Sequence, residues 1–505
     1  MLLPRHKSDR RRNPPPKDGG GCQQGTSVKN KRWLGHLFVF LRSKQMRLNE
    51  EVQRNFLQYT SHFDRRAFAA YNDGLLPLYR RLLYTSYNLN LGSRYVKAAK
   101  VVGDVLGNYH PHGDGAVYAG LIQLTCNEAI SHCLEPMFEA QGNIGNPYSF
   151  DASCRNAAAM RYVEVKLTKY ATEMLLDKEY MAQVPMVPNF DGTTTEPRFL
   201  PAKLPNILIN GSFGIGGINR SLVPSFGTDS VVALLRWLLT NPDATDEDIA
   251  EQFSKMQYRY RYGGVGNITA EHALSDSFSV NLTPHWVERS GKKKVLSFYG
   301  LPGITSTLDK ILKKVYALDG TKAVTDNSDP HAKVPVPMLV DVLMHDDCAH
   351  PEHWEAAVVA AFSETARVTP RLCRKSAVRK FSLVSLLREW LGFRLALETK
   401  VLAARIADYR KSLAREELKL LVTTPEVLKK LPKLFELDKD GQVDYLKSLC
   451  GISDDDAKYI LSLSFSQLTK SDQTGGRSAV ENFRKQIATN ERLLRNPATA
   501  VAKAL

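Results

Sequence analysis

An arginine stands directly before a tyrosine at Arg161-Tyr162, the end of the run AAAMRY. A tyrosine hydroxyl can attack the phosphorus of a phosphodiester and form a phosphotyrosine bond, which is the chemistry of DNA strand transfer. The phenol has a pKa of about 10, so only about one in a thousand is ionised near pH 7 and the attack needs assistance. A guanidinium stays charged and can hold two phosphate oxygens while negative charge develops. The pair predicts Tyr162 as a nucleophile and Arg161 as the group that steadies the phosphate.

The same dipeptide also has a structural interpretation, in which the ring packs in a core and the arginine lies at the surface. Arg-Tyr is common in proteins, so the pair alone does not decide between the two. The rest of the sequence must favour one of them.

Basic residues outnumber acidic ones: Lys and Arg total 68, Asp and Glu total 53, and the formal net charge is +15. Polyanions are natural partners for such a chain, although solubility or a basic tail would explain the same balance. With 505 residues, 43% of them hydrophobic, the chain is long enough for several packed units. No apolar stretch approaches the roughly 20 residues that span a bilayer, so we expect no membrane association.

The seven cysteines are scattered along the chain and none forms a C-x-x-C pair. This spacing argues against a disulfide framework and against a zinc ribbon. A reducing cytoplasm fits best.

Helices separated by tight turns are expected to position the Arg-Tyr pair. Leu75 begins one helix, with Pro77 in the first turn where its missing N–H costs nothing, and Lys97 to Leu106 form another. The Gly-, Asn- and Pro-containing stretch 107–114 reads as a turn whose last residue, Asp114, can cap a third helix. Helix, turn, helix is the plan of a major-groove reader, though many helical domains share it.

Residues 184–218 read as extended and turn-rich, and the alternation in 258–262 (YRYRY) predicts a strand with an aromatic and a basic face. Either a solvated edge strand or a DNA contact would explain that strand. The segment 381–421 lacks proline and repeats apolar residues at helical spacing, which predicts a helix of about 60 Å. A second apolar stripe begins at Val480 and offers an antiparallel partner. An ordinary helical bundle is the alternative to a long arm.

Several blocks, in this order, resemble the DNA-cleaving subunit of type IIA topoisomerases, the GyrA and ParC class with its phage relatives. The resemblance is strong from about residue 56 to 225. The blocks are Arg66-Ala67, DGLLPLYRR (73–81), VVGDVLGNYHPHGD (101–114), QGNIG (141–145), AAAMRY (157–162), FDGT (190–193), LPNILINGS (204–212) and ILSLSFSQLT (460–469).

The resemblance implies roles for individual residues. Tyr162 would form a transient 5′-phosphotyrosyl bond, and Arg161 and Arg66 would neutralise the scissile phosphate. His110 and His112 match a histidine pair near the cut backbone. Arg80 and Arg81 match contacts that position the duplex without reading its sequence, and Ile215 matches an apolar wedge inserted between base steps.

The resemblance also implies an α+β, mainly α fold with a set order of domains. A basic, disordered tail (1–48) would precede a CAP-like winged-helix domain (49–170) and a tower-like α/β domain (171–370). An antiparallel coiled-coil arm (371–425 and 477–505) would carry a small helical C-gate knob (426–476). The fold of 226–370 and the true start, Met1 or Met46, remain open.

In the family that the chain resembles, DNA cleavage needs magnesium held by carboxylates of a Toprim domain. The acidic runs 438–440 and 454–456 read as solvated surface, so we expect no metal site in this chain and place Mg²⁺ and ATP on a GyrB- or ParE-like partner subunit.

The function implied is DNA breakage and rejoining by an ATP-dependent type IIA topoisomerase, acting as a homodimer on double-stranded DNA through winged-helix and C-gate contacts. Because the family's β-pinwheel does not follow the arm, relaxation or decatenation is expected rather than supercoiling. The alternative is a non-catalytic DNA-binding architectural or decoy protein on the same scaffold.

Overall fold

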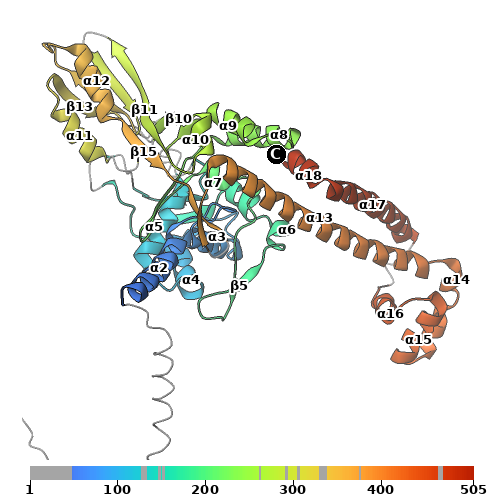
Figure 1. Ribbon diagram of the computed structural model, residues 1–505. Helices are drawn as coiled ribbons and strands as arrows, with labels where there is room; N and C mark the ends of the chain where they lie inside the picture. Colours follow the sequence, from blue (N-terminus) through green and yellow to red (C-terminus); the bar gives the residue numbers. More distant parts are fainter. Residues whose placement is uncertain are drawn as a thin grey trace, which may run out of the picture. The chain divides into compact units, whose positions relative to one another are not determined.

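The computed structural model describes residues 48–126, 134–145, 149–150, 154–260, 263–290, 294–303, 307–328, 338–374, 377–464 and 470–505. The chain divides into two units, residues 1–59 and residues 60–505. The predicted tail, residues 1–48, lies outside the described residues except for Leu48, where helix α2 (Leu48–Ala67) begins. All elements after α2 belong to the second unit. Figure 1 labels most of them along the chain.

Three short helices and a small sheet surround the first apolar core. The helices are α3 (Pro77–Asn88), α4 (Ala98–Asn108) and α5 (Asp114–Leu124). The strands, in the order β1-β4-β3-β2, are β1 (Val96–Lys97), β4 (Glu164–Leu167), β3 (Phe138–Gln141) and β2 (Thr125–Cys126). Apolar side chains spaced along all three helices, among them Leu82, Val101 and Leu121, are fully buried against one another. The predicted helices around 75–83 and 97–106 are confirmed, with Pro77 in the first turn of α3.

Two local predictions in this region were wrong. Helix α4 continues through Asn108, so the turn before α5 is shorter than the predicted 107–114. Asp114 does not cap α5, because Gly113 occupies the cap position and Asp114 is the first helical residue. A carboxylate in the first turn still interacts favourably with the positive end of the helix dipole.

The predicted extended region 184–218 consists mainly of short hairpins. Its strands are β5 (Met186–Pro188) paired with β6 (Thr195–Pro197), and β7 (Ser212–Ile215) paired with β8 (Arg220–Val223). Short helical turns lie before and between the hairpins: η2 (Ala171–Leu175), α6 (Lys178–Met181) and α7 (Asn206–Ile209). The turn-forming residues of this region interrupt the extended backbone, which keeps the strands short.

Residues 228–368, whose fold the sequence left open, contain a larger sheet flanked by helices. Among the described residues, the strand order is β13-β14-β12-β11-β10-β9, and β15 also pairs with β11. The strands are β9 (Gln257–Arg259), β10 (Gly264–Asn267), β11 (Phe278–Ser290), β12 (Lys294–Tyr299), β13 (Thr321–Asp326), β14 (Val340–Met344) and β15 (Glu364–Val368). The helices are α8 (Thr228–Thr240), α9 (Asp246–Ser254), α10 (Ala270–Leu274), α11 (Leu308–Tyr316) and α12 (Pro351–Ala361). Tyr258 and Tyr260 are buried and Arg259 is exposed, so the predicted alternation holds as far as residue 260, and residues 261–262 lie outside the described part.

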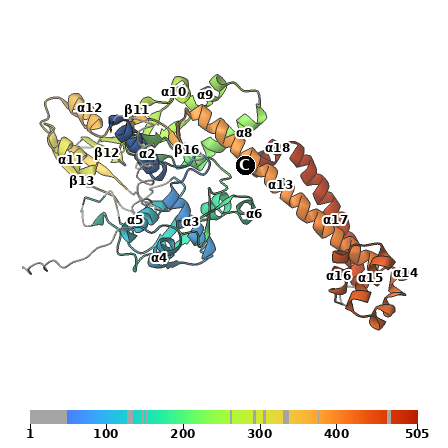
Figure 2. The same cartoon turned by 60° about the horizontal axis from the view of Figure 1, so that its bottom comes forward.

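The predicted long helix and its antiparallel partner are confirmed. Helix α13 (Leu383–Val422) has 40 residues, about 60 Å at 1.5 Å per residue. Helix α17 (Lys470–Arg495) lies along it in both views (Figures 1 and 2), and the rings of Tyr409 and Phe483 are 6.2 Å apart. The chain then ends in α18 (Pro497–Ala504), which packs on α8 and α13. Residues 371–380, which the sequence assigned to the arm, form a hairpin of β16 (Arg371–Arg374) and β17 (Ala377–Lys380).

A small helical cluster lies between α13 and α17 in the sequence and has a core of its own. It contains α14 (Pro425–Leu428), η3 (Leu431–Glu436), α15 (Lys439–Cys450) and α16 (Asp454–Leu461). Both acidic runs lie at helix starts: Asp438 caps α15, and residues 454–456 form the first turn of α16. Asp438 accepts a hydrogen bond from Gly441 N, and carboxylates in the first turn of α16 interact favourably with the positive end of its dipole. Within the described residues, no helix combines the length and apolar character that a membrane span requires.

Candidate DNA-cleavage site

The Arg161-Tyr162 pair lies on an exposed turn, residues 160–162, which we call the tyrosine turn and which the surrounding elements hold at both ends. The Tyr162 side chain is 62% exposed, whereas the next residue, Val163, is completely buried. Two backbone N–H groups at the start of α4 bind this turn: Ala98 N donates to Val163 O at 2.8 Å, and Ala99 N donates to Met160 O at 3.2 Å. The structural interpretation, with the ring in a core, is therefore wrong for Tyr162.

The segment before the pair is held from two further sides. The Tyr118 hydroxyl on α5 donates to Ala158 O at 2.6 Å, and Ala158 N donates to Asn143 O at 2.9 Å. Gly142, beside Asn143, has a φ of +100°, and a Cβ there would lie 3.0 Å from Tyr162 O. The structure thus explains why the QGNIG block has glycine at position 142: a side chain there would be strained and would crowd the tyrosine turn.

Within the pair, the arginine lies over the tyrosine ring. Arg161 Cζ is 4.6 Å from the centroid of Tyr162, a cation–π distance. Both side chains are exposed, so neither the guanidinium nor the ring is enclosed in the core. The arrangement brings together the two groups that the sequence assigned to nucleophile and phosphate holder.

A second cluster of predicted residues follows the other end of α4. The rings of His110 and His112 stack with centroids 4.2 Å apart, and Arg81 Nη1 lies 2.9 Å from His110 Nδ1. Burial lowers the pKa of His110 to about 4, and the neighbouring His112, Arg81 and Arg66 contribute to the lowering in that order. His110 is therefore neutral at neutral pH. Because a guanidinium can only donate, Nδ1 accepts and the ring proton resides on Nε2, where it can donate to a phosphate.

The two clusters lie at opposite ends of one helix. The tyrosine turn binds the first residues of α4, and His110 follows its last turn, with His110 N donating to Val105 O. Eleven residues of helix correspond to about 16 Å along the axis. Arg66 contributes to lowering the pKa of His110. Among the described residues, no hydrogen bond or ring contact joins Arg66 to Tyr162.

Arg80 and Arg81 have different surroundings. Arg80 forms a bidentate ion pair with Asp73, with Nε–Oδ2 at 2.7 Å, and their side chains are only 12% and 0% exposed. This geometry favours a structural role for Arg80 over the expected DNA contact. Arg81 forms a bidentate pair with Glu196 of β6, both contacts at 2.7 Å, while its Nη1 faces His110.

Sequence reasoning missed Glu196. It holds Arg81 against His110 and is itself 13% exposed at the side chain. Its only signal in the sequence was a carboxylate in an extended stretch without basic residues, VPNFDGTTTEP, and the partner lies 115 residues away.

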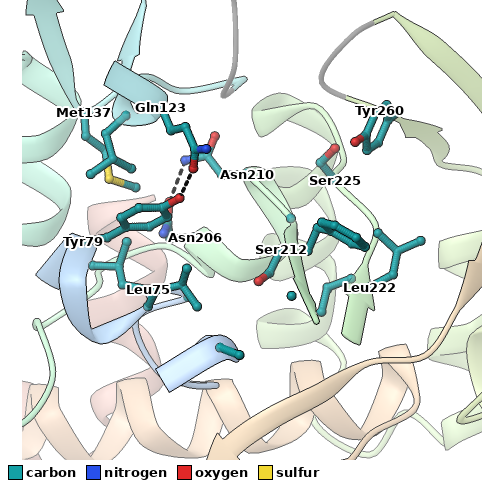
Figure 3. Close-up of a pocket in the computed structure, with 18 of the residues that line it drawn as sticks. Leu75, Tyr79, Gln123, Met137, Asn206, Asn210, Ser212, Leu222, Ser225 and Tyr260 are labelled. Carbon is teal, nitrogen blue, oxygen red and sulfur yellow. Dashed lines mark hydrogen bonds between the residues drawn. The ribbon is translucent and has the colours of Figure 1, made fainter. Parts of the chain in front are cut away.

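The predicted wedge, Ile215, is 66% exposed at the end of β7. The hairpin that carries it forms one wall of a cavity of about 410 Å³. Figure 3 shows the opposite side of this cavity, where the Tyr79 hydroxyl on α3 points to the Gln123 side chain of α5 and Asn210 donates to Asn206. The hairpin therefore lines this cavity, packs Phe213 against the core and leaves Ile215 exposed.

Comparison with known proteins gives the family. A model of the family described as the A subunit of DNA gyrase/topoisomerase IV matches residues 66–504. The chain belongs to this family. The resemblance inferred from the sequence blocks is confirmed at the family level, as is the mixed α+β architecture with a long helix packed on a second one.

Several relatives from bacteria are similar to the chain over much of its length. The DNA gyrase A subunit of Campylobacter fetus is 30% identical over 440 residues, which are 84% of this chain and 49% of the relative. The DNA gyrase A subunit of Helicobacter pylori strain 26695 is 34% identical over 295 residues, 56% of this chain and 34% of the relative. The DNA topoisomerase 4 A subunit of Escherichia coli K12 is 27% identical over 475 residues, 90% of this chain and 60% of the relative. The chain thus spans between about a third and three fifths of the length of these curated relatives.

Proposed function

We propose that this chain is the DNA-breaking and rejoining subunit of a type IIA topoisomerase, with Tyr162 as its nucleophile. The observation that supports the proposal best is the tyrosine turn: an exposed hydroxyl with an arginine over its ring, on a segment fixed by α4, α5 and the QGNIG block. A binding surface alone needs no anchored nucleophile.

The proposed step is a reversible exchange of ester bonds. The Tyr162 oxygen attacks a backbone phosphorus and loses its proton, the bond from phosphorus to O3′ breaks, and the released 3′ oxygen takes up a proton. The product is a 5′-phosphotyrosyl link and a free 3′ hydroxyl. Arg161 holds the non-bridging oxygens as charge builds up on them. Rejoining is the same path in reverse, so no energy source is needed for the ester exchange itself.

The His110 cluster and the wedge would hold the duplex in register. His110, His112, Arg81 and Arg66 present hydrogen-bond donors and positive charge to a neighbouring stretch of backbone. Ile215 would insert between base steps and bend the duplex. Since one chain supplies one Tyr162, a break in both strands requires two copies, and we propose a homodimer.

Magnesium and ATP are proposed to come from a second subunit with Toprim and ATPase domains. In the part of the chain that the structure describes, no three His, Cys, Asp or Glu side chains are arranged to hold a metal ion. The described side chains of these types therefore do not fit a metal centre. Relaxation or decatenation rather than supercoiling, and a phage origin, stay predictions.

A covalent-adduct experiment tests the proposal. The chain is mixed with a Toprim and ATPase subunit from the same source, Mg²⁺ and plasmid, and then denatured with detergent. We expect protein covalently attached to DNA 5′ ends for the wild type and for the control Tyr316→Phe, which alters another exposed tyrosine, and none for Tyr162→Phe. Plasmid shift without any adduct in the wild type would instead support the non-catalytic DNA-binding alternative.

A further inference from the structure

The tip of the β7–β8 hairpin carries two exposed apolar side chains. Ile215 and Ile218 are 66% and 58% exposed, on either side of Gly216 and Gly217. The turn closes through a hydrogen bond from Gly216 N to Asn219 O at 2.7 Å. A hairpin tip of this kind, built around two glycines, has little intrinsic rigidity, so its direction must be set by contacts with the rest of the fold.

A buried carboxylate on α2 supplies such contacts. Asp64 is only 4% exposed, and its two oxygens accept hydrogen bonds from the tip: Gly217 N to Oδ1 at 2.8 Å and Asn219 Nδ2 to Oδ2 at 2.9 Å. A buried carboxylate left without donors is costly, so each bond also favours the position of the tip in which it forms.

Asn219 is fixed on its other side by an arginine from a distant strand. Arg371 Nη1 of β16 donates to Asn219 Oδ1 at 2.8 Å. Because the guanidinium only donates and the carboxylate only accepts, the amide of Asn219 has one orientation, with its oxygen toward Arg371 and its NH₂ group toward Asp64. Three segments, at residues 64, 219 and 371, thus lock one turn.

The two glycines let the tip approach α2 closely. A Cβ at Gly216 would lie 2.0 Å from Asp64 Oδ1, and a Cβ at Gly217 would lie 2.8 Å from Thr60 Cγ2. Both distances are shorter than real Cβ contacts, so any side chain at these positions would push the tip off the helix.

We propose that Asp64 is a positioning residue that holds Ile215 and Ile218 in the direction required for insertion into DNA. The inference rests on the proposed function, because it assigns the hairpin tip to DNA bending. Arg66 follows Asp64 by two residues on α2, so the same helix that holds the tip also carries a predicted phosphate contact. Displacing the tip would therefore change how far the duplex is bent, while the backbone contact from Arg66 would remain. No family motif in the sequence pointed to this aspartate.

The test measures DNA bending by energy transfer between dyes at the two ends of a short duplex, with the full chain and its Toprim and ATPase subunit. Asp64→Ala removes both acceptors, and we expect a severalfold smaller bent fraction with the duplex still bound at saturating protein. The double variant Asp64→Asn with Asn219→Asp exchanges the two groups and keeps every hydrogen bond, including the one from Arg371, so bending should return to the wild-type value. Asp177→Ala is the matched control, since Asp177 also accepts backbone N–H groups, at Glu179 and Tyr180, far along the chain from the tip.

Hydrogen exchange of peptides covering 212–223 gives a second readout that does not depend on DNA. Exchange there should accelerate in Asp64→Ala and not in Asp177→Ala, while the double variant should resemble the wild type.

Wild-type bending and exchange in Asp64→Ala would overturn the inference and leave the proposed function intact. If the wild type bends DNA but forms no covalent adduct, the proposed function fails and the role of Asp64 in bending can still be measured. Loss of bending in the double variant to the same extent as in Asp64→Ala would also contradict the inference.

Discussion

Arg80 and Arg81 are adjacent in the sequence, and both matched DNA contacts, yet their environments separate them. Successive residues on a helix point about 100° apart, so one side chain of α3 reaches the buried Asp73 while the next reaches Glu196 and His110. Sequence could predict that both are cationic. Which of the two remains near the surface depends on partners that are 7 and 115 residues away.

The neutral state of His110 predicts a pH effect on stability. Its pKa is about 4 in the folded chain, against about 6.5 when unfolded, so the unfolded state binds more protons between these values. The free energy of unfolding should therefore fall as pH decreases from about 6.5 to 4. His110→Gln should remove this contribution, which is on the order of 1 kcal/mol after allowance for solvent screening.

Thermal unfolding of the two proteins at about pH 7 and about pH 5 checks this. The melting temperature of the wild type should drop more than that of His110→Gln, and His285→Gln serves as a control for loss of a histidine elsewhere. Equal drops in all three would show that His110 is not held neutral by burial and by its neighbours His112, Arg81 and Arg66.

At the scale of elements, the N-terminal half of α13 is joined to α6 through buried polar groups. Arg394 Nη1 lies 2.8 Å from Glu398 Oε2, with side chains 1% and 3% exposed, and the Tyr180 hydroxyl donates to the same oxygen at 2.6 Å. Burial, and then the neighbouring Glu398, raise the pKa of Tyr180 to about 12 against the lowering effect of Arg394, so the phenol stays protonated as a donor. This network fixes the N-terminal half of α13 against α6.

Removing Glu398 should be strongly destabilising. Glu398→Ala leaves Arg394 as an uncompensated buried charge, and we expect a loss of about 3–5 kcal/mol in the free energy of unfolding. The exposed pair of Arg410 and Glu491, whose side chains are 64% and 40% exposed, joins α13 to α17 and is the comparison. Glu491→Ala should cost less than about 1 kcal/mol. Urea unfolding measures the free energy of unfolding of both variants. Similar losses would mean that the buried network stabilises the fold no more than a surface ion pair does.

At the scale of the whole molecule, the charge balance should dominate DNA affinity. A chain with a net charge of +15 that contacts backbone at several points releases counterions on binding. If it makes about 6–10 phosphate contacts, affinity should fall about 10³- to 10⁵-fold between about 50 and 200 mM salt. Fluorescence anisotropy with duplexes of unrelated sequence measures the slope. We expect similar slopes for all of them, and an affinity independent of salt would exclude the proposed backbone contacts.

The sequence by itself determined the features that depend on local pattern. Apolar spacing without proline set α13 and its partner α17, Pro77 marked the start of α3, and the run of motif blocks identified the family and the Arg161-Tyr162 pair. These follow from helical periodicity, fixed backbone angles and contiguous residues. The end of α4 and the cap of α5 were misplaced by one or two residues, because several polar and glycine residues there can occupy a cap.

Tertiary structure decided what depends on residues distant in the chain. It set Arg66 where its charge acts on the pKa of His110, and it paired Arg80 with Asp73. It also brought Asp64 and Arg371 to the two sides of Asn219. A hydrogen bond or ion pair forms only where folding brings its two partners within about 3 Å, and the spacing of residues in the sequence carries no record of that distance.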